Sequence, residues 1–403
     1  MVATVSLDAI LHKHRIRPSI EAIQPELVQW RRNFHQRPEL AFEENLTAAF
    51  IAQQLTAWGV PHETGIAKTG IVAIIEGQQP GKVLAIRADM DALPIQEENE
   101  IDYCSEHDGI MHACGHDGHV AIALGTAKYL QDHRDGFRGT VKIIFQPAEE
   151  SPGGAKPMIK AGVLKNPDVD AIIGLHIWNN LPLGTVGVRP GALMAAAETF
   201  HLRVQGKGGH GALPHQTVDA IVVGSHIVTA LQTLVSRSVN PLDAAVVTVG
   251  EFKAGDVHNV IADFANISGT VRYFNPQLTR VMGDRLETIV NGVCQSYGAT
   301  YELDYIPMYP PTINDPAIAN LIKTIAEETI ETPLGVMPEC QTMGSEDMSF
   351  FLQEVPGCYF FLGSANPQAD LAYPHHHPRF NFDESVLGMG VEMFVRCVEK
   401  FLA

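Results

Sequence analysis

The sequence has few basic residues and no long apolar run, and both features limit the classes of partner. Its 403 residues include 28 Lys and Arg against 46 Asp and Glu, a formal net charge of −18. Because so acidic a chain repels phosphate backbones, we expect no nucleic-acid partner. No uninterrupted apolar stretch reaches the roughly 18 residues of a membrane span. The most apolar run, residues 220–235, contains Ser, His, Thr and Gln. It therefore predicts a buried helix and no membrane partner.

Cysteine is also scarce, and none of the spacings is that of a disulfide framework. The six cysteines are Cys104, Cys114, Cys294, Cys340, Cys358 and Cys397. The N-terminal segment carries Asp8, Lys13 and Arg15 and lacks the apolar region of a signal peptide. We therefore expect a cytoplasmic protein with reduced cysteines.

The remaining composition is that of a core-forming protein, with 45% hydrophobic and 18% charged residues. This excludes a disordered or collagen-like chain. The length favours two domains over one.

The first half of the chain alternates between strand and helix patterns. After a loose lead-in of 24 residues, a helical pattern begins near Pro25, breaks at Arg37-Pro38 and resumes over residues 43–59. Helical patterns also cover residues 118–130 and 154–161. Four short apolar runs predict buried strands: 70–76, 82–87, 140–146 and 171–176. This alternation predicts an α/β domain built on a mostly parallel, helix-covered sheet.

From Thr199 the pattern changes to β-α-β-β-α-β, the order of a ferredoxin-like α+β unit. The expected strands and helices are, in chain order, 201–205, 217–235, 244–252, 264–274, 276–297 and 300–306. We predict an inserted domain at 197–309 within a larger domain formed by 1–196 and 310–403.

One short run, residues 111–119, holds a thiol and three imidazoles. Cys114, His112, His116 and His119 lie there, just before a predicted helix. Thiolate and imidazole groups bind divalent transition metals. Scattered polar loop residues are the alternative interpretation.

Further potential ligands follow predicted strands, where open α/β sheets place their active sites. They are Asp89, Asp91, Glu149, Glu150 and His176, with His375, His376 and His377 far downstream. Each alone is readily explained as a solvated carboxylate, a core histidine or a polar loop residue. Their recurrence at three consecutive strand ends favours a metal site.

The adjacent pair Glu149-Glu150 suits metal-assisted hydrolysis, because one carboxylate can bind metal while its neighbour accepts a proton from water. A second motif, residues 206–211, matches G-x-G-x-x-G. It lacks the acidic residue about twenty positions later that dinucleotide binding requires, so we exclude that function.

Four motifs together resemble the aminoacylase/carboxypeptidase family of dinuclear metallohydrolases, in particular its amidohydrolase branch with hippurate and auxin-conjugate hydrolases. They are Arg87-Ala88-Asp89-Met90-Asp91-Ala92-Leu93-Pro94, Cys114-Gly115-His116, Gln146-Pro147-Ala148-Glu149-Glu150 and Gly209-His210-Gly211-Ala212-Leu213-Pro214-His215. The resemblance covers nearly the whole chain.

The resemblance implies five metal ligands and one general base, Glu149. The implied ligands are Cys114, His116, Glu150, His176 and His376. His376 is selected by the family's His-x-Pro-x-Phe spacing, which leaves His375 and His377 as flanking residues. The broader family has a metal-binding His-x-Asp motif where this chain has Asp89-Met90-Asp91. The resemblance therefore leaves the role of Asp89 open, and we expect Asp91 at most to contact the metal ligands and not the metal.

The resemblance also implies that residues 197–309 form a lid and a dimer interface. In that lid, His210 would stabilise the tetrahedral intermediate. Asn259 and Arg272, assigned to lid strands, would receive the substrate's carboxylate. For Arg272 an ordinary surface cation is an equal alternative.

We therefore expect a homodimeric, metal-dependent amidohydrolase that cleaves N-acyl amino acids of the acetyl, benzoyl or indoleacetyl type. Two divalent ions are implied, from among zinc, manganese, nickel and cobalt. A dipeptidase or an N-acetyl-diamino-acid deacetylase is the enzymatic alternative. A catalytically silent, dimeric metal-binding module is the alternative from another class, but such a module has no need of Glu149.

Overall fold

The computed structural model describes residues 15–330 and 335–403. Contacts divide the chain into two units, each with its own hydrophobic core. Unit 1 comprises Met1–Leu193, Ile313–Gln341 and Phe350–Ala403, and unit 2 comprises Met194–Thr312 and Thr342–Ser349.

Unit 1 is built on a seven-stranded sheet of order β1-β2-β4-β3-β5-β15-β6. The strands are β1 (His62–Ile66), β2 (Gly70–Glu76), β3 (Val83–Asp89), β4 (Thr140–Gln146), β5 (Ala171–Pro182), β6 (Val186–Gly187) and β15 (Gly357–Ala365). The four inner strands, β4, β3, β5 and β15, are parallel. The outer strands pair antiparallel. The α/β prediction is confirmed, with a parallel centre and antiparallel edges.

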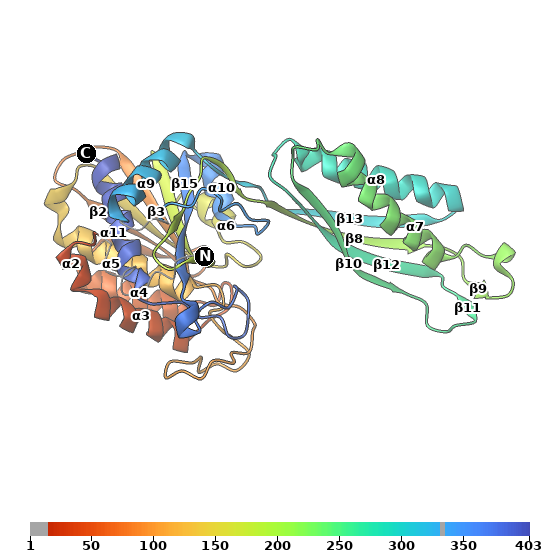
Figure 1. The fold of residues 1–403 in the computed structure, drawn as a ribbon, viewed down its shortest axis with the longest axis horizontal. Coiled ribbons are helices and arrows are strands. Elements are labelled where there is room, and N and C mark those ends of the chain that lie inside the picture. The colour runs from red at the N-terminus through yellow and green to blue at the C-terminus, as the bar shows by residue number, and fades with distance from the viewer. Residues whose placement is uncertain (1–14, 331–334) are drawn as a thin grey trace, which may run out of the picture. The chain divides into compact units, whose positions relative to one another are not determined.

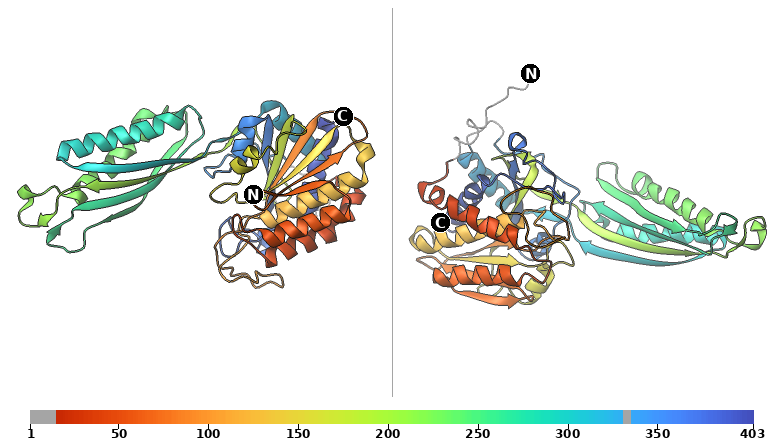
Figure 2. Two further views of the ribbon diagram at one scale, coloured as in Figure 1. Left: turned by 180° about the vertical axis from the view of Figure 1, so that it is seen from behind. Right: turned by 90° about the horizontal axis from the view of Figure 1, so that it is seen from below.

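Helices surround this sheet, so β3 and β4 are buried along nearly their whole length. The helices are α2 (Pro18–Glu21), α3 (Gln24–Gln36), α4 (Asn45–Ala57), α5 (His116–Asp132), α6 (Ala155–Lys160), α9 (Pro316–Thr329), α10 (Met348–Glu354) and α11 (Val386–Phe401). Helix α5 contacts β3 and lies against α3 and α11 (Figure 2). A Cβ atom on Gly118 would lie 2.4 Å from Ile177 Cδ1, so glycine permits α5 to approach the sheet. Contrary to the predicted loose lead-in, Pro18–Glu21 is helical and Ile20 is buried.

Unit 2 has the predicted β-α-β-β-α-β order. Its main elements are β8 (Ala196–Gln205), α7 (Ala220–Thr233), β10 (Ala245–Ala254), β12 (Phe264–Tyr273), α8 (Leu278–Tyr297) and β13 (Thr300–Tyr309). The sheet is antiparallel, with the order β10-β12-β8-β13, and both helices cover one face (Figure 1). This arrangement confirms the predicted ferredoxin-like α+β unit.

Helix α7 covers most of the run predicted as a buried helix, residues 220–235, and it is buried on one face only. Val223, Ile227 and Leu231 lie in the core of unit 2, whereas Ile221 and Val222 are exposed. Within the described part of the chain, residues 220–238 alone pass a length and hydropathy test for a membrane span, with a mean hydropathy of 1.2. About a third of this window is buried (33%), as expected for a helix that packs one face on the core of unit 2 and exposes the other.

Candidate metal centre

Two predicted ligands, Cys114 and His116, lie at the start of α5. Gly115 between them has φ 90°, a left-handed conformation that favours glycine and turns the chain into the helix. The carbonyl oxygen of Asp91 accepts a hydrogen bond of 2.9 Å from His116 Nδ1, so that nitrogen carries the proton. Its Nε2 has no hydrogen-bond partner among the described residues. His116 is thus buried with Nδ1 held by a carbonyl oxygen and with Nε2 left for a metal ion, which would displace the proton on that nitrogen.

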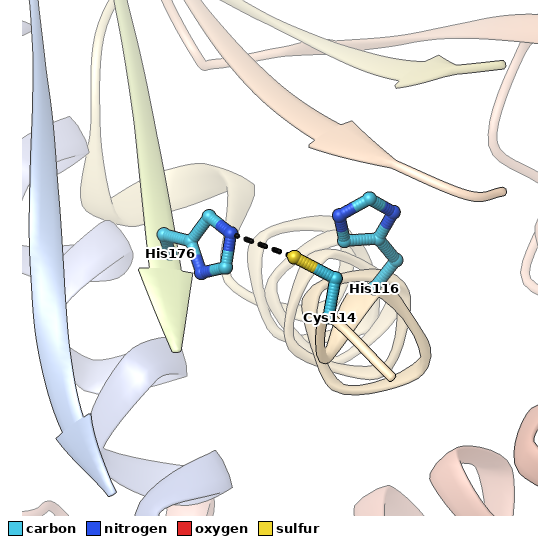
Figure 3. Close-up of side chains that lie close together, drawn as sticks. All are labelled: Cys114, His116 and His176. Atoms are coloured by element: carbon cyan, nitrogen blue, oxygen red, sulfur yellow. Dashed lines mark hydrogen bonds between the residues drawn. The ribbon is translucent and has the colours of Figure 1, made fainter. Parts of the chain in front are cut away.

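The third predicted ligand, His176, faces Cys114 from β5 (Figure 3). Its Nε2 lies 3.4 Å from Cys114 Sγ, and its Nδ1 donates to the carbonyl oxygen of Ile177 at 2.6 Å. Burial and neighbouring histidines hold the pKa of His176 well below its usual value, so the ring is neutral. The sequence interpretation ended the strand at His176, but β5 continues to Pro182 because β15 pairs with it along that length.

The acidic pair follows β4, in a turn held by Asp91. The two carboxylate oxygens of Asp91 accept hydrogen bonds from the backbone N–H groups of Glu149, at 2.8 Å, and Glu150, at 3.0 Å. With its carbonyl oxygen on His116, Asp91 orients three predicted site residues. Asp91 thus lies behind these residues, and its supporting role stays a prediction.

The last predicted ligand, His376, approaches from the segment before α11. Its backbone N–H donates to the carbonyl oxygen of Ala113 at 2.8 Å, and its Nε2 lies 3.0 Å from Glu150 Oε1. The neighbouring histidines have other partners. His375 Nε2 accepts from the Asn179 N–H at 3.3 Å, and His377 Nδ1 accepts from the Arg379 N–H at 3.0 Å.

The five predicted ligands form two overlapping groups of potential metal-binding atoms. Atoms of Cys114, His116 and His176 lie within 4.8 Å of one another, as do those of Cys114, Glu150 and His376. Glu149 lies within the same distance of His116 and Glu150. Cys114 belongs to both groups.

His119 lies in the same cluster but has no nitrogen left for a metal. Its Nε2 accepts from the Ile177 N–H at 2.9 Å, so Nδ1 carries the proton that it donates to Asp89 Oδ1 at 2.5 Å. Asp89 also pairs with Arg87. The sequence noted His119 only as one of three imidazoles. Its i,i+3 spacing from His116 was the signal that both share a helix face.

The electrostatics of the cluster suit a divalent cation. The carboxylates of Asp89, Asp91 and Glu149 are all buried, and burial together with Glu150 and Glu149 raises the pKa of the Cys114 thiol well above its usual value. Burial alone would lower the pKa of His116, but Asp89 and Asp91 raise it to about 10. This excess of buried negative charge and the soft S and N donors fit transition-metal ions.

The remaining predicted residues belong to unit 2 and fall at two places within it. His210 lies in the short strand β9 (Gly209–His210), which pairs with β11 (Val260–Ile261). Asn259 precedes β11 in a turn, not on a strand as predicted, and its carbonyl oxygen accepts from the Gly211 N–H at 2.8 Å. Arg272 lies near the far end of β12, and its Nη1 donates to Ser345 Oγ at 3.1 Å.

Comparisons with known proteins agree with these features. A profile described as peptidase family M20/M25/M40 matches residues 85–400. The N-acyl-L-amino acid amidohydrolase of Geobacillus stearothermophilus is 47% identical over 303 residues, 75% of this chain and 81% of that protein. IAA-amino acid hydrolase ILR1-like 4 of Arabidopsis thaliana is 39% identical, over 93% of this chain and 86% of that protein.

A solved structure extends the likeness to the fold. The Bacillus subtilis YxeP protein, described as a dinuclear metal binding peptidase from the M20 family, superposes with a TM-score of 0.82. It is 34% identical, and the match covers 95% of this chain and 99% of that one. Sequence motifs, fold and ligand cluster thus lead to one conclusion: the chain belongs to the M20/M25/M40 peptidase family.

Proposed function

We propose that this chain is a metal-dependent amidohydrolase that cleaves N-acyl amino acids into a carboxylic acid and an amino acid. One observation carries the proposal, the convergence of Cys114, His116, Glu150, His176 and His376 around the acidic turn that holds Glu149. The names of the Geobacillus and Arabidopsis relatives support N-acyl amino acids as the substrate class.

In this proposal Glu149 is the general base and water is the nucleophile. Divalent ions, when bound, supply Lewis acidity to the site. The carboxylate of Glu149 takes a proton from the attacking water and passes it to the departing amine nitrogen. Because no side chain attacks the carbonyl carbon, no acyl-enzyme forms.

We propose two ions with Cys114 as the shared ligand, and zinc, manganese, nickel or cobalt as candidates. The two overlapping ligand groups support this number. The mixed sulfur, nitrogen and oxygen donors suit all four metals, so loading in the cell depends on availability.

His210 would donate a hydrogen bond to the developing oxyanion, and Asn259 and Arg272 would receive the substrate's carboxylate. Within unit 2, Asn259 lies beside the Phe264 end of β12, whereas Arg272 lies next to Tyr273. At about 3.3 Å per residue, these positions are roughly 25 Å apart. Two such groups of one chain do not meet on a single small carboxylate. We therefore propose a homodimer in which His210 and Asn259 serve the partner's site.

The proposal is tested with purified, metal-reconstituted protein and a panel of acetyl-, benzoyl- and indoleacetyl-amino acids, with dipeptides and an N-acetyl-diamino acid alongside. We expect turnover of at least one N-acyl amino acid and its loss on chelation. A preference for dipeptides or for the N-acetyl-diamino acid would mean that these compounds, and not the other N-acyl amino acids, are the substrate class. Stoichiometric metal binding without turnover of any amide would support the silent binding module instead.

A further inference from the structure

A buried carboxylate outside the metal cluster, Glu44, contacts the turn that carries Glu149 and Glu150. Glu44 is 0% exposed and comes directly before α4, about 100 residues from that turn in sequence. Its Oε1 accepts hydrogen bonds from the backbone N–H groups of Ala148, at 2.9 Å, and Phe42, at 3.0 Å. Its Oε2 accepts from Thr69 Oγ1 at 2.5 Å.

Ala148 has an unusual backbone conformation, with φ 55°. A residue with a Cβ atom rarely occupies this left-handed region, and it does so at a cost unless its surroundings hold it there. Phe42, which contacts the same oxygen, has φ 63°. One carboxylate oxygen thus holds two non-glycine residues in left-handed conformations.

The local sequence explains why this turn needs an acceptor from elsewhere. Strand β4 ends at Gln146, and Pro147 has no N–H group to continue the sheet. The Ala148 N–H is the first donor after the strand, and its residue is fully buried. A buried N–H without an acceptor is destabilising, so Glu44 supplies what the sheet cannot.

We propose that Glu44 is a positioning residue that fixes Ala148 in the left-handed conformation and so directs Glu149 and Glu150 toward the metal ligands. Asp91 holds the next two N–H groups of the same turn, so two carboxylates from separate segments fix three consecutive residues. Glu44 acts on the turn through its hydrogen bond to the Ala148 backbone. The inference rests on the proposed function, in which Glu149 is the base.

The proposal separates the shape of Glu44 from its charge. A glutamine at this position keeps an oxygen for the two N–H groups and presents an amide to the Thr69 hydroxyl, which can rotate to accept. An alanine removes both acceptors. Glu43 is the matched control, because it is the neighbouring carboxylate and is exposed.

The first measurement is amide hydrogen exchange in metal-free full-length protein, which requires no activity. In Glu44→Ala we expect the peptide containing Ala148 to exchange at least about tenfold faster, while β3 is unchanged. Glu44→Gln and Glu43→Ala should match the parent chain. Unchanged exchange in Glu44→Ala would overturn the proposal even if the parent enzyme hydrolyses amides. If Glu44→Ala does not fold, Glu44→Asp takes its place with the same expected direction, because its shorter side chain does not reach Ala148.

The second measurement is kcat, KM and bound metal for the same variants on the best panel substrate. We expect kcat to fall about 10- to 100-fold in Glu44→Ala with KM little changed, the loss typical of a displaced catalytic group. Adding Ala148→Gly should restore part of kcat, because glycine adopts positive φ without strain. Equal losses in Glu44→Gln and Glu44→Ala would contradict the proposal. A parent enzyme that cleaves no amide would refute the proposed function and leave the exchange result to decide on Glu44.

Discussion

At the scale of single residues, hydrogen bonds fix how two of the proposed ligands face the rest of the cluster. The Asp91 carbonyl oxygen fixes the tautomer of His116, and the Ile177 carbonyl oxygen fixes that of His176. Both rings therefore present Nε2. Such partners behind the ligands typically matter 10- to 100-fold for metal affinity or activity, as a rough guide.

The general-base role is tested by Glu149→Gln, which keeps the side-chain shape and removes its basicity. We expect kcat to fall by roughly 10²–10⁴ while metal content is retained. Steady-state kinetics and metal analysis on the same preparation provide the test. Near-normal turnover in a fully loaded variant would remove Glu149 from the mechanism.

Cys114→Ser tests the shared ligand. A hydroxyl is a much poorer anionic ligand than a thiolate, so both metal affinity and metal stoichiometry should fall. Titration with zinc or manganese against a competing chelator measures this. Cys104→Ser is the matched control, since the Cys104 thiol donates to the Asn99 carbonyl oxygen at 2.8 Å and belongs to neither ligand group.

At the scale of elements, α3 is connected to both ligand-bearing segments through Arg31. Its buried guanidinium donates to Asp117 Oδ2 at 2.8 Å, next to His116, and to Asn381 Oδ1 at 2.9 Å, beyond His376. Burial alone would raise the pKa of Asp117, yet Arg31 and His35 hold it far below its usual value. The buried Asp117 carboxylate therefore stays ionised because of the positive charges of Arg31 and His35.

Replacing Arg31 by methionine should leave Asp117 buried without its cation and lower the free energy of unfolding by about 3–5 kcal/mol. Urea unfolding measures this change. Arg32 is the control. Like Arg31, it pairs with Glu384, but its side chain is 44% exposed. For Arg32→Met we expect less than about 1 kcal/mol. Similar decreases in the free energy of unfolding of the two variants would mean that burial does not make the contribution of Arg31 larger than that of Arg32.

In unit 2, Glu198 on β8 gives a pH-dependent prediction. Burial raises the pKa of its carboxyl, although hydrogen bonds from Tyr273 and Tyr305 act in the opposite direction. A raised pKa in the folded state means that stability declines as the pH rises from the unfolded toward the folded pKa. Relative to Glu198→Gln, the parent chain should therefore lose stability as the pH rises from about 4, near the unfolded-state pKa of glutamate, toward the raised folded-state pKa.

This prediction is tested by measuring the free energy of unfolding of the parent chain and of Glu198→Gln across that pH range. Glu302→Gln, at an exposed position on β13, controls for surface charge. A difference between parent and Glu198→Gln that does not change with pH, or that changes in the opposite sense, would contradict the argument.

At the scale of the whole molecule, the proposal that His210 acts across a dimer predicts complementation. His210→Ala should lower kcat by about 10²–10³ with metal content unchanged, the usual loss of an oxyanion donor. Mixing it with Glu149→Gln after subunit exchange should restore about a quarter of the parent activity, because half the dimers then contain one intact site. No recovery in demonstrably mixed dimers would place His210 in its own chain's site.

The local sequence was sufficient for most of the secondary structure and for the types of the candidate ligands. The order of elements in unit 2 followed from periodicity and turn residues, which are local properties. The Cys114–His116 run and the Glu149-Glu150 pair were identifiable because metal chemistry restricts the residue types. The predicted strand end at His176 was wrong, since β5 extends only because β15 pairs with it, and strand pairing is not local.

What the tertiary structure alone decided is how distant residues act on these ligands. Glu44 and Ala148 are separated by 104 residues, and Arg31 and Asn381 by 350, yet each pair shares a buried hydrogen bond. The neighbouring sequence contains no signal of this pairing, because the identity of a glutamate or an arginine does not reveal whether its side chain is buried or exposed. The sequence determined which groups are available for chemistry. Only the packing of the sheet and helices determined which of them are buried together, and therefore how the ligands are held.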